Sequence, residues 1–257
     1  MITVKVNAPT GTIILDRADR CNALNRSMIS ELTQALDDLR QERKVRGIVL
    51  AGAGPHFCTG LDLKQLQETA SDSQSQQAWF QDALALQALI ETVLRLPKPV
   101  IAAVDGAAMS SGLALVLACD MVVASHRSIF SVPATRLGLV SGLVVPLLAF
   151  RLGAATASRL VLGGDELPAV EAKTLGMVSH VVDSDMVWVR ASTWIEQIAE
   201  GAAESLQLSK RVLNEMVGES LFTILSSGAA AMATSLTTEA AEEGLRAFSE
   251  NRKPTFP

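Results

Sequence analysis

Two glycine-containing turns carry the backbone groups that could stabilise a developing negative charge. The first turn contains Gly60 and Leu61, and the second contains Ser110 and Ser111. Each turn leads from an expected strand into an expected helix, where the first N–H groups lack partners within the helix and the helix dipole favours negative charge. Gly60 allows torsion angles that leave the N–H of Leu61 free to point at a ligand. One N–H group from each turn would together form an oxyanion hole for a carbonyl that becomes an enolate. Either turn alone also fits an ordinary tight turn.

Length and composition indicate a globular, water-soluble protein. The chain has 257 residues, 49% of them hydrophobic, and a net charge of −5. These values suit one large domain, or one domain with a small appendage, and give no bulk attraction to nucleic acid or anionic membranes. Cys21, Cys58 and Cys119 form no CxxC pair, so we expect neither a zinc site nor a disulfide framework. The N-terminus lacks a signal-peptide layout, and apolar runs such as 113–118 and 143–150 are too short to span a bilayer. We therefore expect a cytoplasmic location with no membrane or nucleic-acid partner.

The elements that position the two turns follow from hydrophobic periodicity. We expect strands at 2–6, 12–15, 45–51, 100–104, 121–124 and 179–182, and helices from Ser27, over 79–95 and through most of the chain beyond 142. Ser27 is the expected N-cap of the first helix, Asp62 caps the helix after the first turn, and the polar residues 69–78 are expected to form a mobile surface loop. Strands that alternate with helices predict an α/β fold.

Several segments resemble the crotonase (enoyl-CoA hydratase/isomerase) superfamily. The matching segments are 19–25 (DRCNALN), 57–63 (FCTGLDL), 99–120, 136–139 (RLGL), 172–178 (AKTLGMV) and 247–254 (AFSENRKP). The resemblance implies a spiral of ββα units followed by a helical trimerisation region, which divides the chain into a core at 1–195 and an oligomerisation region at 196–257. It implies a homotrimer or a dimer of trimers.

The resemblance also implies an acyl-CoA thioester as substrate. Coenzyme A then enters as part of the substrate, with no permanently bound cofactor and no metal. Leu61 and Ser111 occupy the two oxyanion positions of the family. The substrate and CoA contacts that the resemblance implies are Thr59, Gly60, Leu63, Ser110 and, from a neighbouring subunit, Lys253.

The sequence departs from the family at the positions of its catalytic carboxylates. The hydratases carry one glutamate at the position of Ala114 and another at that of Ala134, and several isomerases carry a carboxylate at Ser141, or at Gly142 if the alignment slips by one residue. None of these side chains can do general acid–base work at neutral pH, which costs ~10²–10⁴-fold in rate. The chain has no tyrosine, which excludes the tyrosine-dependent decarboxylase variants.

A few polar side chains are candidates to fill this gap. Arg136 would reach the acyl group or a substrate carboxylate, or instead form a surface or interface ion pair. Ser110 and Thr135 would orient water, although hydroxyls on turns more often bond to local backbone. Asp82 and Glu91 are further candidates for the missing carboxylate, because their helix can line the acyl tunnel in the family. Their helical spacing instead favours a place on the solvated face of that helix. His56 is expected at the outer mouth of the pocket as a solvated residue, while His126 and His180 are expected to be structural.

Three interpretations of function stay open. The first is an enzyme that binds acyl-CoA and stabilises a thioester enolate, with weak hydratase activity. The second is a non-catalytic paralogue that binds CoA esters or serves as an assembly partner. The third is altered chemistry, such as decarboxylation or thioester hydrolysis, on a substrate that supplies its own charge.

Overall fold

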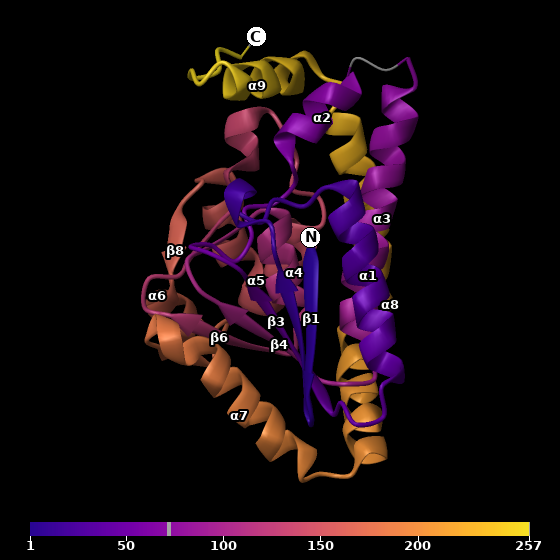
Figure 1. Cartoon of the computed structure of the whole chain (residues 1–257). Helices are drawn as coiled ribbons and strands as arrows, with labels where there is room; N and C mark the ends of the chain where they lie inside the picture. The colour runs from indigo at the N-terminus through magenta and orange to yellow at the C-terminus, as the bar shows by residue number, and fades with distance from the viewer. Residues whose placement is uncertain (71–72, 257) are drawn as a thin grey trace.

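A six-stranded sheet forms the centre of the fold (Figure 1). The computed structural model describes residues 1–70 and 73–256, apart from the side chains of 214–219. The strand order is β1 (Ile2–Asn7), β2 (Thr10–Leu15), β3 (Gly47–Gly52), β4 (Val100–Val104), β6 (Met121–Ser125) and β9 (His180–Val182). β1 and β2 form an antiparallel hairpin, and the other neighbours are parallel. A second sheet contains β5 (Ala107–Met109), β7 (Ile129–Ser131) and β8 (Glu166–Pro168), of which neither β5 nor β8 was predicted. The predicted α/β class is confirmed.

Helices cover both faces of the larger sheet because its strands are apolar on both faces. In β3, Val49 faces helix α7 (Val187–Ala199), whereas Ile48 and Leu50 face the main core. This alternation is the period of two that a strand imposes on its side chains. The other helices are α1 (Arg26–Gln41), α2 (Leu63–Ala70), α3 (Ser75–Arg95), α4 (Ser111–Ala118), α5 (Val144–Leu162), α6 (Ala169–Thr174), α8 (Ala203–Ser235) and α9 (Glu239–Ser249), with short 3₁₀ turns η1 (Ala18–Arg20), η2 (Pro133–Leu137) and η3 (Ser184–Met186).

Two local predictions are wrong. Helix α1 is capped by Asn25, whose side-chain oxygen accepts the N–H of Met28 at 2.8 Å, so Ser27 lies inside the helix and bonds to Glu31 instead. The predicted loop at 69–78 is partly helical, because α2 extends to Ala70 and α3 begins at Ser75. Residues 71 and 72 lie outside the described part. The prediction failed because the polar composition of 69–78 fits the solvated ends of two helices as well as it fits a loop.

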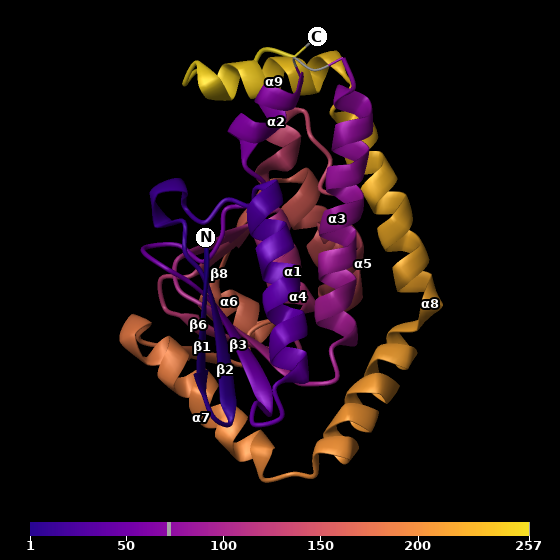
Figure 2. The same ribbon diagram turned by 45° about the vertical axis from the view of Figure 1, so that its right-hand side comes forward.

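The C-terminal helices pack against the same chain. Helix α8 runs along α3 and crosses α5, and α9 lies across α2 at one end of the molecule (Figure 2). Where α8 meets the turn just before α5, a Cβ on Gly228 would lie 2.1 Å from the carbonyl oxygen of Gly142, so the two backbones meet without side chains between them. The predicted division at residue 195 falls inside α7, which continues to Ala199.

Helix α5 is the one helix of the described residues with the length and hydropathy of a membrane span. Its backbone is broken at Gly153, which has a φ of 79° and a ψ of 160°. Its first half contributes Leu147 and Leu148 to the protein core between α4 and α8. The first half of α5 is therefore part of the protein core, whereas most residues of the second half are exposed or half-buried.

Candidate active site

The two predicted turns lie side by side. The N–H groups of Phe57 and Cys58 both donate to the carbonyl oxygen of Ala107, at 3.0 and 3.1 Å, and the N–H of Met109 donates to the carbonyl oxygen of Cys58 at 2.9 Å. These bonds align the first turn parallel to β5, which leads directly into the second turn. Residues about fifty positions apart in the sequence therefore meet at one point.

Gly60 lets the two turns approach each other closely. It has a φ of 104°, a region that side chains with a Cβ rarely adopt. A Cβ here would lie 3.2 Å from both the carbonyl oxygen of Met109 and the Cβ of Ser110, and 3.5 Å from the nitrogen of Ser111. Within the described part of the chain, neither the N–H of Leu61 nor that of Ser111 has a hydrogen-bond partner. Both residues line one pocket, as a pair of oxyanion donors must.

Ser110 is held in an unfavourable backbone conformation next to these donors. Its φ is 46° and its ψ is −119°, a combination that costs a residue with a side chain on the order of 1–3 kcal/mol. The N–H of Ser110 donates to the carbonyl oxygen of Ser131 at 3.0 Å, and its own carbonyl accepts the N–H of Ala114 at 3.0 Å. These bonds direct the start of α4 at the pocket, so its first N–H groups face a ligand.

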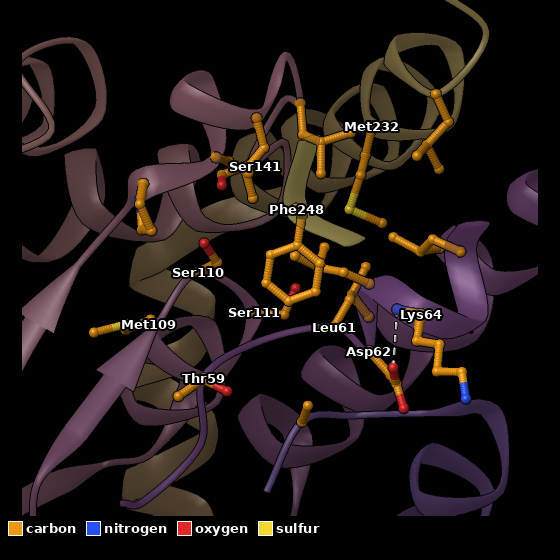
Figure 3. A pocket seen from close by; sticks show the side chains of 18 of the residues that line it. Thr59, Leu61, Asp62, Lys64, Met109, Ser110, Ser111, Ser141, Met232 and Phe248 are labelled. Carbon is orange, nitrogen blue, oxygen red and sulfur yellow. Dashed lines mark hydrogen bonds between the residues drawn. The ribbon is translucent and has the colours of Figure 1, made fainter. Parts of the chain in front are cut away.

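The pocket has a volume of about 470 Å³ and is mainly apolar (Figure 3). Asp62 and Lys64 lie on one side, and Ser110 and Ser141 lie on the opposite side. The lining residues are Arg20, Cys21, Ala23, Thr59, Leu61, Asp62, Leu63, Lys64, Leu66, Met109, Ser110, Ser111, Pro133, Ala134, Leu137, Leu139, Val140, Ser141, Met232, Ser235, Leu236 and Phe248. Such a concave apolar site with a few polar groups is typical of a binding pocket for a small molecule.

Asp62 is the one carboxylate among these lining residues, and it is already paired. It lies 2.6 Å from the guanidinium group of Arg17. Its other oxygen accepts the N–H groups of Lys64 at 3.1 Å and Gln65 at 3.3 Å, as a cap of α2 (Figure 3). The predicted capping role of Asp62 is confirmed. Both oxygens of the Asp62 carboxylate therefore have structural partners within the chain.

The three positions of the family carboxylates differ in their surroundings. Ala134 and Ser141 line the pocket, with exposed fractions of 6% and 8%. Ala114 is completely buried in α4 and is not a lining residue.

Arg136 and Thr135 are not brought to the pocket. The Arg136 guanidinium donates to the carbonyl oxygen of Gly164 at 3.0 Å, and the Thr135 hydroxyl is directed at the carbonyl of Val161 at 3.5 Å. The tight turn of η2 sends these side chains away from Ala134, so the catalytic role considered for them is not supported. Lys253 is exposed in the C-terminal tail and does not line this pocket; its contact from a neighbouring subunit stays a prediction.

The remaining polar candidates have structural partners. Asp82 forms an ion pair with Arg26 at 2.6 Å, and Glu91 accepts a hydrogen bond from Gln87 at 2.8 Å. The Nδ1 atom of His56 accepts the N–H of Ala107 at 3.3 Å, which supports the turn rather than chemistry. No group of three potential metal ligands occurs among the described residues.

Sequence reasoning missed the part of the pocket that comes from the C-terminal helices. Met232, Ser235 and Leu236 reach it from the end of α8, and Phe248 reaches it from α9. No local motif marks these residues, because their position depends on how the two helices pack. Cys21 was also missed as a lining residue, although it lies within the matching segment 19–25 and its carbonyl accepts the N–H of Thr59.

Glu243 anchors the tail that follows α9. Its side chain is only 9% exposed and accepts hydrogen bonds from Arg252, Arg246 and the N–H of Thr255. These donors, Arg252 first, lower the pKa of Glu243 below its ordinary value of 4.5. A lowered pKa in the folded state means that the contribution to stability is present above about pH 4.5 and is lost as the pH falls through the folded pKa.

We expect Glu243→Gln to release the tail at neutral pH. Trypsin should then cleave after Arg252 faster than in the unchanged protein, and mass spectrometry of the native digest measures this rate. Glu250→Gln is the matched control, because Glu250 bonds to Arg252 at the surface, where ion pairs contribute little. Equal cleavage rates in the two variants would contradict an anchoring role for Glu243.

The comparisons with known proteins agree with this geometry. The family model for enoyl-CoA hydratase/isomerase matches residues 6–257. The human mitochondrial methylglutaconyl-CoA hydratase is 32% identical over 254 residues, covering 96% of this chain and 74% of that protein. The human mitochondrial enoyl-CoA hydratase domain-containing protein 2 is 31% identical over 250 residues, covering 95% of this chain and 84% of that protein.

Solved structures show the same fold. An enoyl-CoA hydratase/isomerase from Pseudoalteromonas atlantica T6c has a TM-score of 0.87 and 28% identity, covering 100% of this chain and 99% of that one. An enoyl-CoA hydratase/isomerase from Xanthobacter autotrophicus Py2 has a TM-score of 0.83 and 30% identity, covering 100% and 98%. The resemblance drawn from the sequence segments is thereby confirmed. The chain belongs to the enoyl-CoA hydratase/isomerase family of the crotonase superfamily.

Proposed function

We propose that the protein binds acyl-CoA thioesters and stabilises a thioester enolate through the N–H groups of Leu61 and Ser111. The observation that carries this proposal is the pair of unpartnered N–H groups at one pocket wall, brought together by the close approach at Gly60. The printed names of relatives, which include hydratases of CoA thioesters, support the substrate class. Each oxyanion donor is worth about 10²–10³ in rate.

The side of the pocket with Thr59 and Lys64 suits the coenzyme A part of such a substrate. Arg20 and Lys64 supply positive charge for phosphate groups there, and Thr59 and Leu63 form the adjacent wall. Gly60, which follows Thr59 in the chain, stays a predicted contact. Lys253 of a neighbouring subunit is proposed to approach the same phosphates. Coenzyme A arrives with the substrate, and the proposal requires no permanently bound cofactor.

Hydratase activity is proposed to be weak. Hydration needs a group that positions water and moves protons, and Ala114, Ala134 and Ser141 cannot do so at neutral pH. Asp62, the lining carboxylate, is held by Arg17. The lack of acid–base groups at positions 114, 134 and 141 also favours the second candidate function, a non-catalytic CoA-ester-binding paralogue.

Thiol labelling tests whether acyl-CoA occupies this pocket. Burial raises the pKa of the Cys58 and Cys119 thiols to about 12, whereas Cys21 is partly exposed and lines the pocket. We expect maleimide to label Cys21 alone in the native protein, and acetyl-CoA to slow that labelling in proportion to occupancy. Cys21→Ser should remove the native labelling, which identifies the thiol. Labelling of Cys21 that saturating acetyl-CoA leaves unchanged would reject this pocket as the thioester site.

Hydration of crotonyl-CoA, followed by loss of the enoyl-thioester absorbance, tests the catalytic part. We expect crotonyl-CoA to bind. Its hydration should be ~10²–10⁴-fold slower than in an enzyme with positioned acid–base groups. Fast hydration would mean that another group replaces the missing carboxylates.

The oligomeric state and location belong to the same proposal. Exposed apolar side chains occur on α8, where Leu208 and Val212 are 58% and 56% exposed, and on α5 at Phe150. These surfaces support a homotrimer or a dimer of trimers in which residues 196–257 contribute to assembly. A cytoplasmic location agrees with the free thiols of the three cysteines.

A further inference from the structure

The indole N–H of Trp79 is buried and has no hydrogen-bond partner within the described part of the chain. Trp79 lies near the start of α3 and is 6% exposed. A buried tryptophan usually places this N–H against an acceptor, because an unpaired buried donor has lost its bonds to water without replacing them. Trp188 shows the ordinary case, since its Nε1 donates to the Thr12 hydroxyl at 3.1 Å. The Trp79 donor is therefore ready for an acceptor that comes with a ligand.

Trp79 belongs to a small apolar cluster that forms one wall of the pocket. The buried members of this cluster are Leu66, Trp79, Leu236 and Leu245, and the half-buried residues packed against it are Leu61, Leu63 and Leu139. They bring α2, α3, the end of α8 and α9 together at one end of the molecule (Figure 2). All of them except Trp79 and Leu245 line the pocket. Trp79 is therefore part of the layer of side chains that backs this leucine wall.

The surroundings of the Trp79 indole suit a neutral acceptor better than a carboxylate. Apart from Trp79 the cluster consists of leucines, so it carries no charge. Arg26 contacts α3 at Asp82, close to Trp79 in the sequence, but its guanidinium group donates to both carboxylate oxygens of Asp82, at 2.6 and 2.8 Å. A carboxylate buried without a free cation loses more in hydration than one hydrogen bond returns. A ketone oxygen accepts an N–H at a much smaller cost of burial.

We propose that Trp79 selects acyl chains that carry a neutral oxygen acceptor, such as a ketone, away from the thioester. This inference rests on the proposed function, because the thioester carbonyl must first be held by Leu61 and Ser111. Leu61 also packs against the cluster, so an acyl chain that leaves the oxyanion hole runs along the leucine wall. A shift of the Leu66 or Leu236 side chain brings the oxygen of the chain to the indole N–H. A plain alkyl chain fills the same wall and leaves this donor unpaired.

Nuclear magnetic resonance of the indole N–H groups tests the contact in the unchanged full-length protein. The chain has three tryptophans, so isotope-labelled protein gives three indole signals, and Trp79→Phe identifies one of them. Hexanoyl-CoA and octanoyl-CoA are each compared with the analogue that carries a ketone at the penultimate carbon. We expect the Trp79 proton to move downfield with a ketone at one of these lengths and to move much less with the matching plain chain. If Trp79→Phe does not fold, Trp188→Phe and Trp194→Phe assign the other two signals and leave the third to Trp79.

Calorimetric titration of the same thioesters measures the energetic effect. The affinity of the ketone relative to the plain chain should fall about tenfold in Trp79→Phe, the effect of one hydrogen bond to an otherwise unpaired donor. Trp188→Phe is the matched control, because Trp188 lies on α7 and donates to Thr12. That variant should keep the relative affinity of the unchanged protein. Adipoyl-CoA, which ends in a carboxylate, should bind more weakly than the ketone of the same chain length.

The outcomes separate this inference from the function on which it rests. Acetyl-CoA has no chain that could reach the cluster, so its failure to bind overturns the proposed function as well. Acetyl-CoA binding with equal affinity for ketone and plain chain at both lengths overturns only the role of Trp79, and so does an indole signal that the ketone leaves in place. Tighter binding of adipoyl-CoA than of the ketone overturns the neutral acceptor.

Discussion

Gly228→Ala is expected to lower the free energy of unfolding by about 3 kcal/mol, at the upper end of the cost of overpacking. The added Cβ would lie 2.1 Å from the carbonyl oxygen of Gly142 and 2.7 Å from its carbonyl carbon, which are backbone atoms that cannot rotate away. Alanine within a helix is more stable than glycine by ~0.5–1 kcal/mol. The energy of the clash must exceed this gain for the variant to be less stable than the unchanged protein. Urea unfolding followed by circular dichroism measures the difference.

Gly201→Ala is the matched control for this prediction. Gly201 lies just before α8. The atom nearest to a Cβ added there would be the carbonyl oxygen of Ile198, at 3.4 Å. Its substitution should change the unfolding free energy by less than about 0.5 kcal/mol, as most exposed substitutions do. If both variants unfold at the urea concentration of the unchanged protein, the crossing of α8 and α5 is looser than the structure has it.

Gly60→Ala is expected to reduce hydration of crotonyl-CoA by about 10²-fold, the lower value for removing one oxyanion donor. A Cβ at 3.2 Å from the Met109 carbonyl and the Ser110 Cβ must push the two turns apart, and alanine is strained at a φ of 104°. The N–H groups of Leu61 and Ser111 then no longer meet on one oxygen. Free coenzyme A has no thioester carbonyl, so its affinity in a calorimetric titration should change much less than the rate.

Gly176→Ala controls for backbone strain alone. Gly176 has a φ of 83°, yet an added Cβ would meet nothing within 4 Å. This variant should lose some stability and keep its activity. Equal loss of activity in the two variants would show that Gly60 acts through general destabilisation rather than through the approach of the two turns.

The candidate site could be predicted where it depends on local chain geometry. Gly60 and the start of the second turn were found because a glycine-containing turn before a helix leaves N–H groups without partners, and this holds whatever surrounds it. The resemblance to the family then singled out Ser111 as the second donor. Asp62 was found for the same reason, as a side chain that caps its own helix. Asn25 was missed as a cap because Asn25 and Ser27 both suit that position, and only the path of the entering chain separates them.

The other wall of the site could not be predicted from local patterns. Leu236 and Phe248 reach the pocket because α8 passes α5 at the glycine crossing and α9 then turns over α2, which are relations between helices far apart in sequence. Arg136 shows the reverse case, in which a residue next to a lining position is turned away by a 3₁₀ turn. Side-chain direction within such a turn changes with each residue. A residue next to Ala134 in the sequence, such as Arg136, therefore need not face the pocket.

The place of Phe248 in α9, which follows all the strands in chain order, has a consequence for biosynthesis. A protein made on the ribosome folds from its N-terminus, and its first segments can pack while later ones are still being made. The sheet and the two turns with Gly60 and Ser111 can therefore form early, but the pocket has no complete wall until α9 has been released and has docked. A nascent chain would carry an assembled oxyanion hole with an open apolar pocket, so ligand binding should begin only once α9 has been made and has docked.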